Sequence, residues 1–241
     1  MQLYVLFAAL ISLLGFTQCE TTNEAINTST GEVVATTSDR LKRGNDVIPI
    51  SEYVAQNPSL KDAATAVFAG GCFWCTEAAF ERIQGVTDVV SGYTDGDGSK
   101  PSYKTVSYGQ TDYTEAIYVF YDESVIDYNT LLDIFFTAHD PTQLNRQGPD
   151  RGTQYRGGIY PQGDAQRAVA EAFIQQLEAS GVYDDPIVTE VKDFRQFWLA
   201  EGYHQNYYVL NPSQSYIVNV SRPKVKKVEK KFADRLKPAY R

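Results

Sequence analysis

Short apolar runs alternate with longer segments of helical spacing along residues 58–221. The short runs predict strands over residues 64–69, 86–93, 116–121, 153–160 and 187–191. A stretch rich in Gly, Asp and Ser over 95–102 predicts a loop between the second and third of these strands. The apolar pattern therefore indicates a mixed fold rather than an all-helical or all-strand one.

Three segments place their apolar residues at the spacing typical of helices. The first covers 72–84 and ends at Gly85, and the last covers 163–180 and ends at Gly181. Between them, Asp127 is a candidate N-cap for a helix rich in Leu, Ile and Phe. The order strand, helix, strand, strand, helix, strand predicts an α+β fold. We expect a ferredoxin-like split β-α-β two-layer sandwich with C-terminal extensions.

The N-terminal residues lie outside this pattern. Residues 3–16 form an apolar run without a charged side chain, shorter than the roughly 20 residues a membrane span needs. This run predicts an export signal over 1–19, in which Cys19 is placed as in a bacterial lipoprotein signal; ordinary cleavage and a buried N-terminal helix are the alternatives. We expect an exported protein, periplasmic or tethered to the membrane only through a lipid at Cys19.

Composition separates a linker and a tail from the catalytic region over 58–221. Residues 20–57 are rich in Thr, Ser, Asn and Glu, which predicts a flexible linker. The net charge of −8 argues against nucleic-acid binding, although residues 222–241 carry nine Lys and Arg against two acidic residues. This basic tail, net +7, predicts an amphipathic helix, and we expect it to pack on the rest of the chain, net −15.

The strongest local motif is GGCFWCTEAAF at residues 70–80. Cys72 follows a glycine turn at the start of a predicted helix, where exposed N–H groups and the helix dipole favour a thiolate. Cys75, three residues later, favours a redox-active C-x-x-C over a structural pair or half of a zinc site. We expect no metal, because His139 and His204 lack the spacing of ligands.

Several motifs occur in one order: GCFW, GYT, PSY, TEA, HDPTQLNRQGPDRGTQYR and YHQNYY, within residues 71–208. Together they resemble peptide methionine sulfoxide reductase A, from about Val67 to Pro212. The resemblance implies reduction of the S epimer of methionine sulfoxide, in proteins and peptides and also free, as repair of oxidative damage. It also implies an enzyme without a bound cofactor, recycled by an external thiol such as thioredoxin. We expect it to act as a monomer.

The resemblance assigns catalytic roles to four residues. Cys72 corresponds to the nucleophile that attacks the sulfoxide sulfur, and Glu115 corresponds to the acid that protonates the departing oxygen. That role requires an apolar environment that raises the pKa of Glu115. Tyr103 and Tyr155 correspond to a pair of tyrosines that bind the oxygen. Without the resemblance, the tyrosines would be read as core residues and Glu115 as a solvated residue of a strand.

Three further residues correspond to the substrate pocket. Phe73 and Trp74 match apolar residues around the methyl group of the substrate, and Asp150 matches a carboxylate close to it. By themselves, Phe73 is equally a core residue and Asp150 a turn residue. His204 is expected to hydrogen-bond within the fold.

The sequence departs from the commonest family pattern at Cys75, which replaces the glycine of GCFWG, and no cysteine follows it. We therefore expect Cys75 to be the resolving cysteine, which condenses with a Cys72 sulfenic acid to form a disulfide. The alternative is that Cys75 packs inertly and the external thiol reduces the sulfenic acid.

Two other functions compete with this reading. A general disulfide oxidoreductase also places C-x-x-C at the start of a helix, and would exchange protein disulfides without reducing sulfoxides. A surface-tethered binding module would use the Cys72–Cys75 pair only as a staple.

Overall fold

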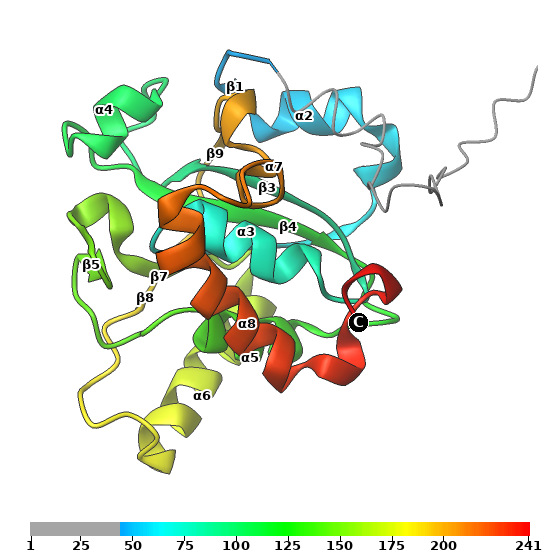
Figure 1. Ribbon diagram of the computed structural model, residues 1–241, viewed down its shortest axis with the longest axis vertical. Helices are drawn as coiled ribbons and strands as arrows, with labels where there is room; N and C mark the ends of the chain where they lie inside the picture. The colour runs from blue at the N-terminus through cyan, green and yellow to red at the C-terminus, as the bar shows by residue number, and fades with distance from the viewer. Residues whose placement is uncertain (1–43) are drawn as a thin grey trace, which may run out of the picture. The chain divides into compact units, whose positions relative to one another are not determined.

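The computed structural model describes residues 44–241, and within them a seven-stranded sheet has the order β1-β9-β3-β4-β2-β7-β8 (Figure 1). A short hairpin of two further strands stands apart from this sheet. In chain order the strands are β1 (Ile48–Pro49), β2 (Ala64–Gly70), β3 (Val86–Thr94), β4 (Thr114–Tyr121), β5 (Arg146–Gln147), β6 (Asp150–Arg151), β7 (Gly157–Ile159), β8 (Glu190–Val191) and β9 (Phe197–Leu199).

The four central strands form the predicted ferredoxin-like core. They lie in the order β7-β2-β4-β3, and each neighbouring pair is antiparallel. Helix α3 (Phe73–Glu81) connects β2 to β3, and α5 (Tyr128–Ala138) lies between β4 and β7 in the chain. This is the split β-α-β topology expected from the order of elements. β1 and β9 extend one edge of the sheet, and β8 extends the other by pairing parallel to β7.

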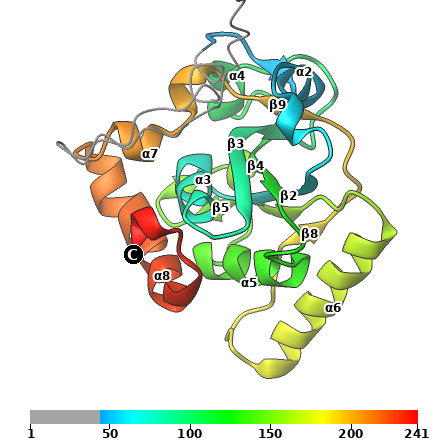
Figure 2. The same cartoon turned by 90° about the vertical axis from the view of Figure 1, so that its right-hand side faces the viewer.

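Helices cover both faces of the sheet (Figure 2). On β2, Phe68 packs in the cluster with α3 and α5, whereas Val67 and Ala69 pack in a second cluster with Tyr53 on the opposite face. This alternation follows from the two-residue period of a strand. The longer helices besides α3 and α5 are α2 (Ile50–Gln56), α6 (Asp164–Ser180) and α8 (Arg222–Lys231).

Shorter helical turns complete the chain. They are η1 (Pro58–Leu60), α4 (Tyr103–Ser107), η2 (Thr153–Tyr155), η3 (Gly202–His204), α7 (Tyr207–Leu210), the π-helix η4 (Ile217–Ser221), η5 (Ala233–Arg235) and η6 (Pro238–Tyr240). Two helix ends have the chemistry expected from the sequence: the Asp127 side chain accepts a hydrogen bond from the Thr130 N–H, and Gly181 is left-handed at the end of α6.

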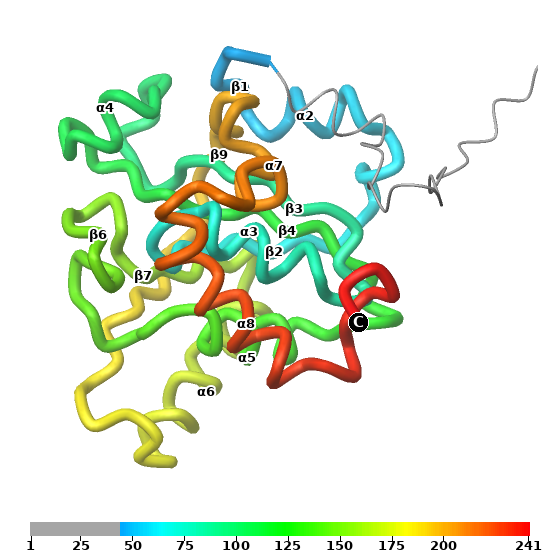
Figure 3. Tube along the Cα trace, in the orientation of Figure 1, coloured from blue at the N-terminus to red at the C-terminus, as the bar shows by residue number. Residues whose placement is uncertain are grey.

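The C-terminal residues pack on the core in the same unit as the sheet. Val225 and Val228 of α8 are buried, and the chain then returns beside α3 (Figure 3). There the Gln84 N–H donates to the Arg235 carbonyl at 2.8 Å, and Ile83 forms an isolated bridge with Leu236. The apolar stripe of this basic segment is therefore used as core.

The predicted linker over 20–57 extends too far. Residues 48–56 form β1 and α2, and β1 pairs with β9. Tyr53 is fully buried and donates its hydroxyl to Asp88 at 2.6 Å. Because the segment as a whole is polar in composition, its one aromatic residue, Tyr53, did not indicate a folded element. The export signal over 1–19 and the linker up to residue 43 lie outside the described residues.

Two predicted strands are shorter than expected. Of residues 153–160, only 157–159 form a strand, because 153–155 make a tight helical turn after Gly152, which has a φ of 131°. Of residues 187–191, only Glu190 and Val191 pair with β7. Among residues 44–241, no helix is long and apolar enough to cross a membrane.

Candidate active site

Strand register brings several predicted site residues to one end of the sheet. Phe68 of β2 pairs with Ile117 of β4, so the end of β2 lies beside the beginning of β4, where Glu115 is. Gly70 pairs with Gly157, so β7 also begins there, two residues after Tyr155. These pairs are antiparallel, and therefore the segments that precede and follow the strands meet at this end of the sheet.

The glycine turn at this end of the sheet positions Cys72. Gly71 has a φ of +85°, and a Cβ at Gly71 would lie 2.5 Å from the Cβ of Gln147, so both conformation and space require glycine. Cys72 is the N-cap of α3, as predicted, and its carbonyl accepts a hydrogen bond from the Cys75 N–H at 3.1 Å. One helical turn thus places the two cysteines on the same side of α3.

Burial changes the expected protonation of Cys72. The residue is only 5% exposed, and burial raises the pKa of its thiol well above its usual range. Hydrogen bonding to Cys75, the charge of Cys75 and the charge of Glu115 raise this pKa further, while a hydrogen bond with Tyr216 opposes them. A helix N-terminus contributes about 0.3–2 kcal/mol, or roughly one pKa unit, whereas burial can shift a pKa by 3–5 units. The burial of Cys72 therefore opposes the thiolate that its position at the helix start favours.

The pKa of Cys75 shifts in the opposite direction. A hydrogen bond from Cys72 lowers the pKa of Cys75 to about 7, against the effect of its burial. The charge of Lys224 and a hydrogen bond with Ser221 also lower it, and the charge of Asp150 raises it. The Cys75 sulfur lies 3.1 Å from the Ser221 hydroxyl oxygen. Within the pair, these interactions favour ionisation of Cys75 over ionisation of Cys72.

Glu115 is a buried acid beside Cys72. It is 2% exposed, and burial raises its pKa to about 8; the charges of Asp150 and Cys75 add to this shift. The Phe73 N–H donates to its carboxyl oxygen at 3.1 Å, which opposes the shift only in part. Glu115 is consequently protonated at neutral pH, the state needed to donate a proton.

Tyr103 and Tyr155 enter the same region from two different segments. Tyr103 begins α4, where its N–H donates to Glu201 at 2.8 Å, and Tyr155 ends η2. Burial raises the pKa of both hydroxyls, and the charges of Glu115 and Cys72 raise both further. Both phenols therefore keep their protons and can donate hydrogen bonds.

Trp74 forms an aromatic wall with residues from the 203–208 segment. Its indole stacks on Tyr207 at a centroid distance of 3.9 Å, and its N–H donates to Nδ1 of His204 at 3.3 Å. Phe73 is 1% exposed and packs behind this wall, 5.1 Å from the His204 ring centroid. Of the two predicted pocket residues, Trp74 is the one that keeps exposed surface.

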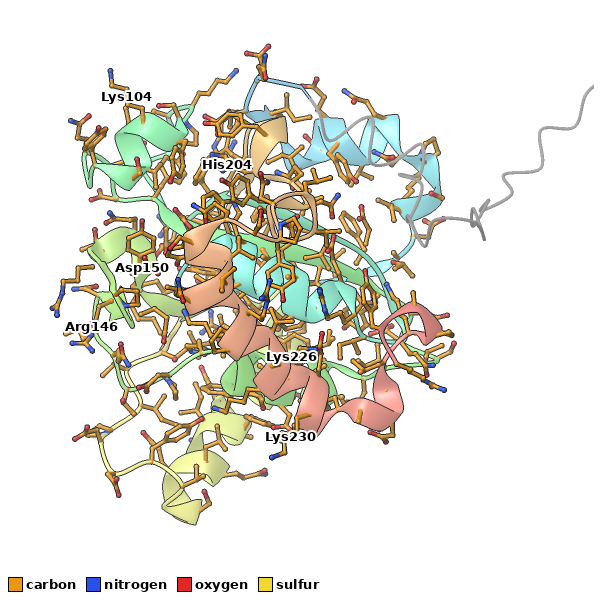
Figure 4. The ribbon with its side chains drawn as sticks, viewed as in Figure 1. Lys104, Arg146, Asp150, His204, Lys226 and Lys230 are labelled. Atoms are coloured by element: carbon orange, nitrogen blue, oxygen red, sulfur yellow. The ribbon has the colours of Figure 1, made fainter. Side chains whose placement is uncertain are left out.

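Asp150 reaches this end of α3 from β6, and His204 from η3 (Figure 4). The Tyr216 hydroxyl donates to Asp150 at 2.5 Å, and its ring lies edge-on to Trp74 at 5.8 Å. Since Tyr216 also hydrogen-bonds Cys72, it connects Asp150 to Cys72. Within residues 44–241, no group of three or more His, Cys, Asp or Glu side chains could hold a metal ion.

Comparison with known proteins agrees with this arrangement. The family model described as peptide methionine sulfoxide reductase matches residues 64–236. The chain belongs to this family. The reductase is 51% identical over 172 residues to peptide methionine sulfoxide reductase MsrA of Haloquadratum walsbyi, covering 71% of this chain and 98% of the relative. It is 50% identical to MsrA of Ralstonia nicotianae, covering 71% and 92%.

Two solved structures resemble the reductase in fold. Mxr1 of Saccharomyces cerevisiae in reduced form is 36% identical with a TM-score of 0.58, covering 63% of this chain and 87% of that one. Methionine sulfoxide reductase A of Corynebacterium diphtheriae is 33% identical with a TM-score of 0.56, covering 62% and 76%. Both matches support the α+β fold.

The sequence did not point to four residues that the reductase places at its site. Tyr216, Ser221 and Lys224 lie beyond Pro212, where the resemblance ends, and Glu201 lies just before YHQNYY. Glu201 accepts hydrogen bonds from the Tyr93 hydroxyl and the Tyr103 N–H, so it holds α4 against β3. The only available signal for Tyr216 was a tyrosine amid polar residues, which is too weak to interpret.

Proposed function

We propose that the reductase acts on the S epimer of methionine sulfoxide, in proteins and peptides and as the free amino acid, with Cys72 as the nucleophile. Reduction of methionine sulfoxide follows from its family. The assignment of roles within the chain rests on one observation above all: a buried Glu115, protonated at neutral pH, lies beside Cys72. A nucleophilic thiol next to a carboxylic acid is what sulfoxide reduction requires.

The first step transfers the sulfoxide oxygen to Cys72. The Cys72 sulfur attacks the sulfoxide sulfur and passes its proton to Cys75, its hydrogen-bonded partner. Glu115 donates a proton to the sulfoxide oxygen, while Tyr103 and Tyr155 donate hydrogen bonds that stabilise its developing negative charge. The oxygen ends on Cys72 as a sulfenic acid, and methionine leaves in reduced form. Trp74 and the carboxylate of Asp150 border the place that the substrate occupies.

The second step converts the Cys72 sulfenic acid into a disulfide that an external thiol can reduce. Cys75 attacks the Cys72 sulfenic acid, a disulfide forms, and the oxygen leaves as water. A thioredoxin-like dithiol then reduces this disulfide by exchange. The adjacency of the two thiols on the first turn of α3 supports this assignment.

Turnover on resolved epimers tests the proposal. The purified full chain, with dithiothreitol as reductant, is expected to reduce the S epimer of a methionine sulfoxide peptide and not the R epimer. Cys72→Ser should abolish the reaction. Turnover of the R epimer, or activity in Cys72→Ser, would contradict it. For the second step, enzyme oxidised by one equivalent of substrate should contain a Cys72–Cys75 disulfide by peptide mapping, and Cys75→Ser should instead accumulate a Cys72 sulfenic acid.

We also propose that the protein is exported and tethered through a lipid on Cys19. The apolar run over 3–16 and the position of Cys19 support this. In bacterial fractions, the wild-type protein should follow the membrane, whereas Cys19→Ala should be soluble or retain its signal. A wild-type protein that is cleaved after export but not bound to the membrane would contradict lipidation.

A further inference from the structure

Lys224, in the first turn of α8, has an enclosed ammonium group. Its Nζ is buried, and no hydrogen-bond partner for it occurs in the described part of the chain. Burying a cation without a partner is costly. An enclosed charge of this kind is retained most readily where negative charge forms nearby.

The charge of Lys224 acts on two groups of the site and on one group outside it. Its charge acts on Cys75, on Asp150 of β6 and on His139 at the end of α5. Ser221, one turn earlier in the chain and fully buried, contacts the Cys75 sulfur through its hydroxyl at 3.1 Å. The start of α8, which lies beside α3 (Figure 1), thus presents an alcohol and an ammonium toward Cys75.

We propose that Lys224 and Ser221 are positioning residues for the recycling step, in which they stabilise Cys75 as the attacking thiolate. The inference rests on the proposed function, because it requires Cys75 to resolve a Cys72 sulfenic acid. In that step the Cys75 sulfur forms the S–S bond with its electron pair, and the S–O bond of the sulfenic acid breaks. The oxygen leaves with its own proton and the proton given up by Cys75, as water.

The charges around Cys75 explain why this help is needed in the second step. Before the first step, the Cys72 thiol donates the hydrogen bond that contributes most to the low pKa of Cys75. That thiol is consumed when the sulfenic acid forms. The acidic neighbours Glu115 and Asp150 and the hydroxyl of Tyr216 remain, and negative charge on any of them disfavours a thiolate. Lys224 and Ser221 are then the groups that favour it.

The test follows disulfide formation as a function of pH. Reduced full chain, freed of dithiothreitol, is mixed with one equivalent of S-sulfoxide peptide, quenched with acid and analysed for the Cys72–Cys75 disulfide by mass spectrometry. Lys224→Met removes the charge and keeps the length of the side chain. We expect its rate profile to shift upward by about one pH unit, with a rate about tenfold lower near pH 6 and convergence with wild type near pH 10.

Matched variants separate charge from packing. Lys224→Arg retains the charge and should restore the wild-type profile. Lys230→Met removes an exposed lysine of the same helix and should not shift the profile. Ser221→Ala should slow disulfide formation roughly threefold, the loss expected for one hydrogen bond. If Lys224→Met does not fold, as judged by circular dichroism, Lys224→Gln takes its place.

Each outcome has one meaning. A Lys224→Met profile equal to wild type, or lowered equally at every pH, would overturn this inference and leave the proposed function intact. Release of methionine without any Cys72–Cys75 disulfide in wild type would remove Cys75 as the resolving cysteine, and this inference with it. Absence of methionine release in wild type would instead overturn the proposed function.

Discussion

Glu115 and Cys72 show how burial sets the chemistry of single residues. Both carry pKa values raised chiefly by loss of water, one on a strand and one at a helix start. For Glu115 this is useful, because the acid holds its proton until the pH approaches about 8. For Cys72 it opposes loss of the thiol proton, which in the proposed first step passes to Cys75.

The raised pKa of Glu115 predicts the pH dependence of the first step. Methionine release in a single turnover should decline as the pH rises through about 8, because the acid loses its proton. Glu115→Gln cannot donate a proton and should lower the rate by about a hundredfold or more. The rate of methionine release between pH 5 and pH 10 checks both. A Glu115→Gln rate close to wild type would contradict the role of acid.

The same shift predicts a dependence of stability on pH. Between the ordinary pKa of 4.5 and the folded value of about 8, the folded chain binds the Glu115 proton and the unfolded chain does not. Glu115 therefore makes the free energy of unfolding fall as the pH rises through this window. In urea denaturation at several pH values, Glu115→Gln should show a smaller fall than wild type. Parallel curves for the two proteins would show that Glu115 is not linked to folding.

His204 is expected to act through Trp74. Burial lowers the pKa of His204 to about 3, so the ring is neutral, and its Nδ1 accepts the indole N–H of Trp74. His204→Phe removes the acceptor, which should raise KM about three- to tenfold with a smaller change in kcat, because the rate depends on Cys72 and Glu115. His204→Asn, which can offer an oxygen near that position, serves as control. A loss in kcat at constant KM would instead place His204 in the chemistry.

At the scale of elements, α8 contributes both to the stability of the fold and to the site. Val225 and Val228 are buried in the core, the charge of Lys224 acts on Cys75, and Lys226 and Lys230 lie on the exposed face (Figure 4). Arg82 of the neighbouring segment pairs with Glu229 at 2.9 Å. One short helix thus provides packing on one side and charge at its N-terminal end.

Substitution within α8 should separate these two contributions. Val228 is fully buried, so Val228→Ala should lower the free energy of unfolding by about 2 kcal/mol through lost packing. Lys230→Ala, on the exposed face, should change it by less than about 0.5 kcal/mol. Chemical denaturation measures both. Equal stability of the two variants would show that α8 does not contribute to the core.

At the scale of the whole molecule, the folded part begins before the motif-bearing region. β1 completes one edge of the sheet by pairing Ile48 with Leu199, and α2 buries Tyr53 on the face opposite α3. Both elements lie in the segment that composition assigns to a linker. The family model, which begins at residue 64, also leaves them out.

Two truncated proteins should show how much β1 and α2 contribute to stability. A protein beginning at residue 44 keeps β1 and α2, whereas one beginning at residue 58 loses Tyr53 and its hydrogen bond to Asp88. Burial of an aromatic side chain is worth about 3–5 kcal/mol, so the shorter protein should unfold at clearly lower urea concentration. Equal midpoints would show that β1 and α2 add little to stability.

The sequence alone determined the order of strands and helices of the core and the position of Cys72 at a helix start. These features depend on neighbouring residues, since apolar periodicity and glycine turns are local signals. The ordered motifs also selected Glu115, Tyr103, Tyr155 and Asp150, which the fold brings to the region around Cys72.

Only the tertiary structure decided how burial and neighbouring groups shift the pKa values of the two cysteines, and which residues outside the motifs act on them. The pKa of Cys72 depends on its burial. The pKa of Cys75 depends on its hydrogen bond with Cys72, on its burial, and on Lys224 and Ser221, about 150 residues later in the chain. Desolvation and electrostatic interaction depend on distance in space, and no local pattern encodes them. The same reason explains why Tyr53 could not be recognised as a core residue until the sheet it covers was known.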